Sequence, residues 1–84
     1  MRYSVELAPS ARKALRKLEP MIRKRIQIAI DELADHPFPH GFKKLVGDHG
    51  YRIRIGDYRV IYDVEHARLT VLVIRIGHRR EVYR

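Results

Sequence analysis

The sequence predicts a two-layer α+β domain in which a two-helix hairpin packs on a mostly antiparallel four-stranded sheet. Residues 51–62 alternate between apolar or aromatic side chains and mainly arginines on either side of Gly56-Asp57, which is typical of a half-buried β-hairpin. Two amphipathic segments in residues 11–36 predict the helices. A continuous apolar run, residues 69–76, completes the order β-α-α-β-β-β. We expect a single domain, 1–84.

The N-terminal half supplies the first strand and both helices. Residues 2–7 alternate in polarity and predict a strand. Ser10 is a candidate N-cap for a short helix, whose apolar positions recur at i, i+3, i+4 and i+7 over residues 11–18. Pro20 begins the second helix, and Pro37 ends it. Because only a tight turn separates the helices, they should pack as an antiparallel pair.

The segment after the helices has no clear period and predicts a loop. It carries prolines and glycines over residues 37–50, and we expect Phe42, Leu45 and Val46 to pack beneath it. Loops of this length in small domains often have functional roles. The apolar run 69–76 predicts a central strand that is covered on both faces.

The hairpin at residues 51–62 places arginines on one face. A two-residue turn that starts with glycine suits type II′ and sets Arg54 opposite Arg59. Directly opposed residues share a face, so Arg52 joins these two, and their mutual repulsion would be relieved by an anionic ligand. Alternatively, the face is simply solvated, with arginine stems covering apolar surface. The other face is expected in the core: Tyr51, Ile53, Ile55, Tyr58, Val60 and Tyr62.

The amino-acid composition limits the kinds of partner that the protein is expected to bind. Lys and Arg number 18 against 10 Asp and Glu, which gives a net charge of +8 and favours a polyanion or an acidic protein as the partner. The chain has no cysteine, so disulfides and thiolate metal sites are excluded. No apolar run approaches the length of a membrane span, and the protein is expected in the cytoplasm without a membrane partner.

The order of elements, the stretch RIRIGDYRVIYDV and the stretch IRIGHRREVY together resemble the RelE/ParE superfamily of type II toxin–antitoxin toxins. The resemblance runs from YSVELAPSARKALRKL to Tyr83 and is greater to the RelE branch, whose members cleave mRNA on the ribosome. The ParE branch inhibits DNA gyrase and generally lacks the basic catalytic set and the late tyrosine. The resemblance therefore implies a translation-inhibiting endoribonuclease.

The resemblance also implies site residues. Arg52 and Arg54 stand where the best-known member has lysines, and a shorter basic loop here leaves open whether Arg79 or Arg80 takes the later arginine role. The implied catalytic residues are Arg52, Arg54, Arg59, His78, Arg79 and Tyr83. The implied RNA-binding residues are Arg80 and cations of the helices that suit ribosomal RNA, namely Arg12, Lys13, Arg16, Lys17, Arg23 and Lys24.

These residue types suit cleavage of RNA without a metal or another cofactor. The 2′-OH attacks the adjacent phosphate, and arginines stabilise the charge that develops on the phosphoryl oxygens. Tyr83 is the expected base, although an ordinary phenol has a pKa of about 10 that neighbouring arginines would have to lower. His78 is a candidate acid, since an imidazole ordinarily titrates near 6.5. Alternatively, His78 is a turn residue without a role and Tyr83 only anchors the C-terminus.

Partners follow from the same resemblance. We expect a hetero-oligomer with a RelB-like antitoxin, whose acidic C-terminal segment folds on the basic domain, and action on the ribosome and mRNA. Ile61, Leu72 and Ile74 are candidates for apolar surface that such a partner would cover. Two alternatives stay open: a gyrase-inhibiting toxin of the ParE type, and a non-catalytic homologue that only binds its antitoxin. No metal site is expected, because His36 and His40 lack an evident carboxylate partner.

Overall fold

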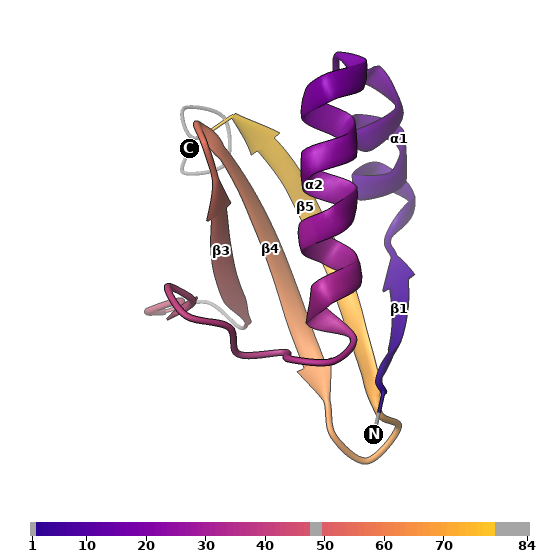
Figure 1. The fold of residues 1–84 in the computed structure, drawn as a ribbon. Helices are drawn as coiled ribbons and strands as arrows, with labels where there is room; N and C mark the ends of the chain where they lie inside the picture. The colour runs from indigo at the N-terminus through magenta and orange to yellow at the C-terminus, as the bar shows by residue number, and fades with distance from the viewer. Residues whose placement is uncertain (1, 48–49, 79–84) are drawn as a thin grey trace.

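The computed structural model describes residues 2–47 and 50–78, and within them two helices cover one face of a five-stranded sheet (Figure 1). The strands are β1 (Ser4–Leu7), β2 (Lys43–Lys44), β3 (Tyr51–Ile55), β4 (Tyr58–Glu65) and β5 (Thr70–His78). The helices are α1 (Pro9–Lys17) and α2 (Pro20–Leu33). The predicted α+β class is confirmed. The sheet has one strand more than the four expected, because Lys43 and Lys44 of the predicted loop pair with β3.

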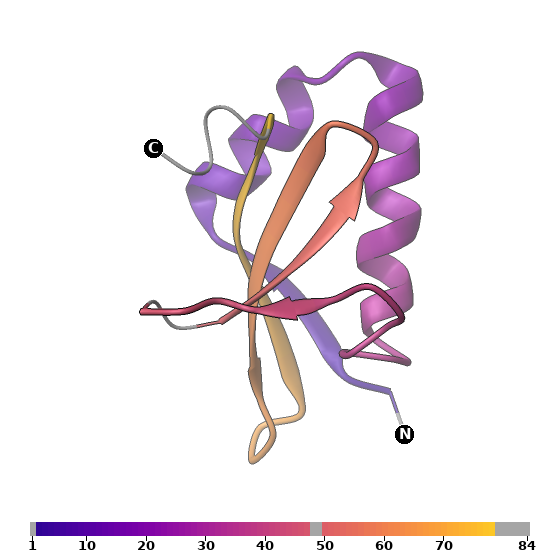
Figure 2. The same ribbon diagram turned by 90° about the vertical axis from the view of Figure 1, so that its left-hand side faces the viewer.

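The sheet order is β1-β5-β4-β3-β2, which makes β5 a central strand as predicted. β1 runs parallel to β5, and the other neighbouring strands are antiparallel. The β3–β4 turn reaches the side of α2 (Figure 2), where a Cβ added to Gly56 would lie 3.9 Å from the guanidinium nitrogens of Arg25. This arrangement leaves the second face of the sheet without a helix.

Both helices begin at proline. The prolyl ring presets φ and removes an N–H that would lack a helical acceptor, so the first turn tolerates it. α1 starts at Pro9 after an N-cap at Ala8, and the prediction of Ser10 as N-cap is therefore wrong. α2 starts at Pro20 as expected, but it ends at Leu33, well before Pro37. Its last turn tightens instead, with the N–H of Ala34 bonding to the carbonyl of Asp31 at 3.1 Å.

The core lies between the helices and the inner face of the sheet. Its buried members come from both helices and from β3, β4 and β5: Ala11, Leu15, Ile26, Ile30, Leu33, Ile53, Val60, Tyr62, Val71, Val73 and Ile76. Tyr62 is the largest fully buried side chain, and Tyr51 and Tyr58 pack against this cluster. The prediction that these tyrosines belong to the core is confirmed.

The loop between α2 and β3 is anchored on aromatic side chains. The Tyr62 hydroxyl donates a 2.6 Å hydrogen bond to the carbonyl of Pro37. The ring of Phe38 lies 5.2 Å from that of Phe42 and 4.9 Å from that of Tyr51, measured between centroids. Phe42 packs against the core as expected, whereas Val46 is fully exposed and was wrongly predicted to pack beneath the loop.

β5 is covered on one face only, contrary to the prediction. Val71 and Val73 are buried under the helices, while Leu72 and Ile74 are 39% and 37% exposed on the other side. The apolar run resembled a strand buried on both faces because its outward positions are apolar as well. The expected apolar surface at Leu72 and Ile74 is present.

Candidate functional site

The β3–β4 hairpin has the predicted register. Arg54 pairs with Arg59, Ile53 with Val60 and Ile55 with Tyr58. Gly56 has φ +59°, and the only described non-glycine residue with positive φ is Leu69, so the turn has the pattern of type II′. Since Val60 faces the core, Arg52, Arg54 and Arg59 project from the opposite side of the sheet, which we call the open face.

The three arginines differ in exposure. Arg54 is exposed, but only 4% of Arg52 and 5% of Arg59 is accessible. A simply solvated face is therefore wrong for two of the three. Burial of a guanidinium is costly unless it is compensated. It also places positive charge where the effective dielectric constant is lower than in water, so attraction to a phosphate would be stronger there.

A further arginine reaches the open face from β5. Arg75 is exposed and pairs with Ile61, which in turn pairs with Arg52. The residue was missed because Val71, Val73 and Arg75 are all odd-numbered, and strict alternation would place Arg75 in the core. The register shifts at Ile61/Tyr62, where Tyr62 pairs with Val73, so Ile74 is an extra residue that turns Arg75 outward. A lone arginine in an apolar run is the sequence signal that could have indicated this irregularity.

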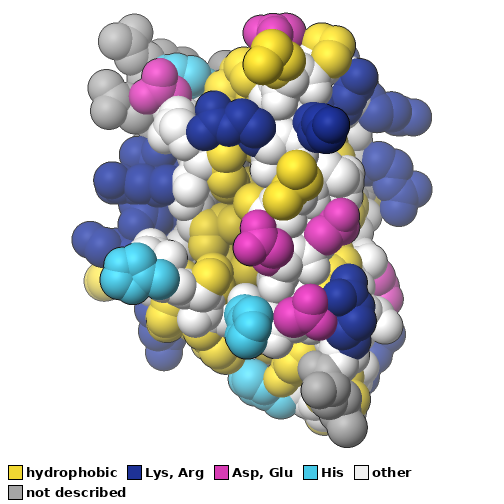
Figure 3. Space-filling model, in the orientation of Figure 1, with side chains coloured by type: hydrophobic (Ala, Val, Ile, Leu, Met, Phe, Trp, Pro, Cys, Tyr) yellow, Lys and Arg dark blue, Asp and Glu magenta, His cyan; other side chains and the backbone are white. Residues whose placement is uncertain are grey.

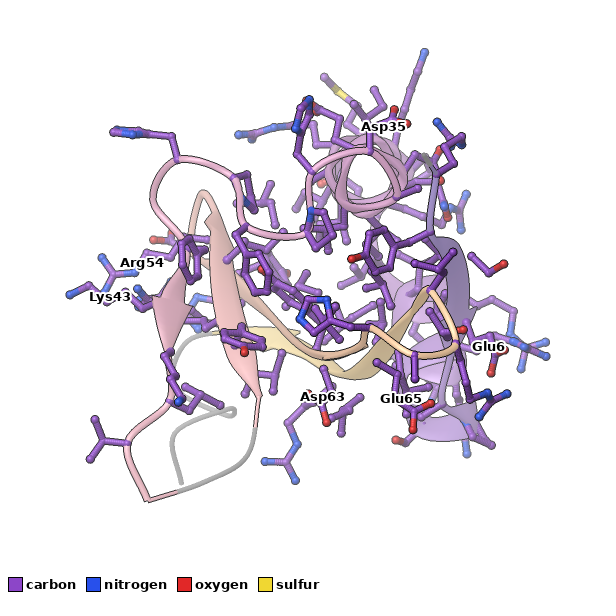
Figure 4. All side chains as sticks on the ribbon, turned by 90° about the horizontal axis from the view of Figure 1, so that it is seen from below. Glu6, Asp35, Lys43, Arg54, Asp63 and Glu65 are labelled. Carbon is purple, nitrogen blue, oxygen red and sulfur yellow. The ribbon has the colours of Figure 1, made fainter. Side chains whose placement is uncertain are left out.

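Lys43 extends the basic part of the open face to the sheet edge. It pairs with Arg52, so both side chains lie on the same side. The other part of this face is acidic: Figure 4 shows Glu6, Asp63 and Glu65 well apart from Lys43 and Arg54. A hollow of about 250 Å³ lies at the acidic part, lined by Glu6, Asp63, Glu65, Arg68, Thr70 and Leu72. The open face thus has a basic and an acidic half.

Other predicted site residues lie elsewhere. His78 pairs with Tyr58 and their rings are 5.6 Å apart between centroids, so His78 is on the core side of the sheet rather than on the open face. The strand register therefore directs its side chain to the face opposite Arg54 and Arg59. The predicted positions Arg79, Arg80 and Tyr83 lie outside the described residues.

The predicted RNA-binding cations of the helices form a separate surface. Five are exposed and Arg23 is half-buried, with its Nη1 donating to the carbonyl of Arg16 at 3.3 Å. Viewed from the helix side, Lys and Arg lie along both margins and across the upper part of the molecule, with several acidic side chains near its centre (Figure 3). The set consists of Arg12, Lys13, Arg16, Lys17, Arg23 and Lys24.

The described residues contain no group of three or more His, Asp or Glu side chains that could hold a metal ion. Burial, with a smaller contribution from Tyr51, raises the pKa of the Tyr62 hydroxyl to about 12. This phenol sits in the core and is unsuited to act as a base.

No helix in residues 2–47 and 50–78 is long and apolar enough to cross a membrane.

Comparison with known proteins gives a consistent assignment. Residues 5–83 match the family described as "ParE toxin of type II toxin-antitoxin system, parDE". Toxin RelG of Mycobacterium tuberculosis is 32% identical over 88 aligned positions, which cover 100% of this chain and 99% of that protein. The putative toxin RelE1 of Methanocaldococcus jannaschii is also 32% identical, with 100% and 98% covered.

Solved structures agree with these relatives. The RelBE2 toxin–antitoxin complex of M. tuberculosis contains a chain with a TM-score of 0.80 and 30% identity, covering 93% of this chain and 99% of that one. A mutant of E. coli toxin RelE in the free state has a TM-score of 0.82 and 27% identity, covering 99% and 90%. The chain therefore belongs to the ParE toxin family of type II toxin–antitoxin systems, within the RelE/ParE superfamily, and is RelE-like.

Proposed function

We propose that this protein is the toxin of a type II system and acts as a ribosome-dependent mRNA endoribonuclease. The observation that carries the proposal is the convergence of Arg52, Arg54 and Arg59 on the open face, two of them buried. Guanidinium groups offer a planar, permanently charged fork that binds phosphate oxygens in pairs. Such a group serves cleavage most where negative charge develops on the phosphoryl oxygens.

The proposed reaction is attack of the 2′-OH on the adjacent phosphate, which releases a 5′-OH and leaves a 2′,3′-cyclic phosphate. Arg52, Arg54, Arg59 and Arg79 would stabilise the phosphorane-like transition state, and the Tyr83 hydroxyl, as phenolate, would accept the 2′ proton. The departing 5′-oxygen would take its proton from water, because the place of His78 on the core side does not support its predicted role as the acid. No step needs a metal ion.

The ribosome would supply positioning that this small domain lacks. A bare set of arginines does not hold a flexible message in line for attack, whereas a large partner can fix the message in a reactive geometry. The exposed cations of α1 and α2 would contact ribosomal RNA through phosphates. Action on ribosomes would place the protein in the cytoplasm.

A RelB-like antitoxin is the proposed regulator. Structures of related toxins include the RelB–RelE complexes of Pyrococcus horikoshii and Methanococcus jannaschii. On this chain, Ile74 exposes apolar surface next to Arg75, and Leu72 extends that surface into the acidic half of the open face. An acidic, partly disordered segment with apolar anchors would gain burial and charge neutralisation by folding there.

Brief expression of the chain without an antitoxin tests the proposal. Growth should arrest, and primer extension on ribosome-bound messages should show new 5′ ends within codons. Intact messages at a verified protein level would refute the proposal that the protein is an endoribonuclease.

Gyrase inhibition is the second candidate function, because the description of the matching family names the ParE toxin. It predicts loss of supercoiling by purified gyrase with intact messages, and a non-catalytic homologue predicts neither effect.

A further inference from the structure

The cations of the open face form rows that cross the strands. One row runs from β2 to β5 through Lys43, Arg52, Ile61 and Arg75, each paired with the next. The neighbouring row contains Arg54, Arg59 and Gly77. Cross-strand partners project to the same side, so both rows present their side chains to the open face.

The first row is longer than one phosphate contact. Neighbouring strands lie about 4.8 Å apart, so the three intervals from β2 to β5 span roughly 14 Å. Lys43 and Arg75 are exposed at its ends, and the buried Arg52 lies between them. A protein can bind several nucleotides of a single strand in this way, because a row of positive charges follows the phosphate backbone.

The charges on the open face exclude a path that runs parallel to the strands. Following β4 on the open face, the side chains are Arg59, Ile61, Asp63 and Glu65. The neighbouring outward position on β1 is Glu6, paired with Leu72. A phosphate backbone running along β4 would leave the arginines and meet these carboxylates, which repel it. A path across the strands avoids them.

We propose that the message crosses the open face perpendicular to the strands, with Lys43 and Arg75 binding the phosphates on either side of the one held by the central arginines. This inference rests on the proposed function and adds two substrate-binding residues and a direction to it. Ile74 lies next to Arg75 at the edge of the path, whereas Leu72 lies in the acidic half, paired with Glu6 and Asp63.

Binding of a short single-stranded RNA of about eight nucleotides tests the path. Its sugars carry 2′-O-methyl groups, so the RNA cannot be cleaved, and fluorescence anisotropy gives Kd at several salt concentrations. Lys43→Ala and Arg75→Ala should each raise Kd about three- to tenfold, and each should lower the slope of log K against log salt by about 0.7. Arg75→Gln provides a second variant with a longer stem if Arg75→Ala melts early.

Lys44→Ala is the matched control. Lys44 is also exposed and adjacent in β2, but it pairs with Tyr51 and therefore projects to the other side of the sheet. Its Kd and salt slope should equal those of the wild type. A neutral methylphosphonate placed in turn at each linkage of the RNA extends the test. At one linkage it should weaken wild-type binding but not binding by Lys43→Ala, and at another the same should hold for Arg75→Ala.

The outcomes separate the two proposals. Equal effects of Lys43→Ala and Lys44→Ala, or an unchanged Kd in the Arg75 variants, would overturn the path. Absence of salt-dependent RNA binding by the wild-type protein would overturn it too. Cleavage of message on ribosomes by the same wild-type preparation reports on the proposed function independently, since it does not require these two residues to bind flanking phosphates.

Discussion

Arg59 shows what a single residue contributes to the open face. It stands opposite Arg54, a like-charge pair that destabilises the hairpin unless something else offsets the repulsion. It is also nearly inaccessible, at 5% exposure, so its desolvation adds a further cost. If Arg59 binds the scissile phosphate as proposed, its substitution should affect cleavage more than packing alone would explain.

Arg59→Gln should lower the rate of single-turnover cleavage by about 10²–10³, because one charge contact to the transition state is lost. Arg59→Lys keeps the charge but not the planar fork and should fall between Gln and the wild type. Because Arg59 is buried, thermal melting of each variant is the control. A folded Arg59→Gln variant that cleaves at the wild-type rate would remove Arg59 from the site.

Tyr83→Phe keeps the ring and removes only the hydroxyl. If the hydroxyl accepts the 2′ proton or orients the 2′-OH, cleavage should fall by roughly 10²–10⁴ while the melting temperature stays nearly constant. If Tyr83 is only a structural anchor, both values should match those of the wild type. That second result would contradict the assignment of Tyr83 as base.

Tyr62 makes a prediction about alkaline stability. Its pKa is raised to about 12 in the folded protein, above the ordinary phenol value of 10.0. A raised folded pKa contributes stability that is fully present below about 10 and is lost between about 10 and 12, with a slope up to about 1.4 kcal/mol per pH unit. Denaturant unfolding from pH 8 to 12 should therefore show a steeper loss for wild type than for Tyr62→Phe. Parallel curves would contradict it.

At neutral pH the same substitution removes the hydrogen bond from the Tyr62 hydroxyl to the carbonyl of Pro37. Leaving that buried carbonyl unsatisfied should cost about 1–3 kcal/mol of unfolding free energy. The loss would identify the bond as an anchor for the loop that precedes β2.

At the scale of elements, local patterns predicted most of the structure. The hairpin register, the type II′ turn and the two helices follow from alternation, from Gly56 and from helical periodicity, which act over a few residues. The features that were missed depend on distant contacts. β2 exists because β3 has a free edge, and Arg75 turns outward because β5 carries an irregularity opposite Ile61/Tyr62.

The candidate site was likewise predicted only in part, because the burial of Arg52 and the place of His78 depend on the neighbouring strands.

Gly50 links the loop to β4. It has φ +109°, and a Cβ there would meet the carbonyl oxygen of Tyr62 at 2.7 Å. Gly50→Ala should therefore cost more than the roughly 1–2 kcal/mol expected from the positive φ alone. Gly47→Ala is the control, because Gly47 has φ +78° with open space around its Cβ position. Equal losses of unfolding free energy in the two variants would mean that the loop can move away from Tyr62.

At the scale of the molecule, two cationic surfaces lie on different sides of the sheet. The helices carry one, and the basic half of the open face carries the other. This separation suits a protein that docks on a large RNA with one surface and acts on a single strand with the other. The acidic half, at Glu6, Asp63 and Glu65, would repel a phosphate backbone and so favour the path proposed across the strands.

The most direct test of this account is cleavage of a defined message on programmed ribosomes by the purified chain, with the chemistry of the new RNA ends analysed. The account predicts cleavage that depends on the ribosome and yields 2′,3′-cyclic phosphate and 5′-OH ends. An intact message at saturating protein, or cleavage that leaves 5′-phosphate and 3′-OH ends, would contradict it.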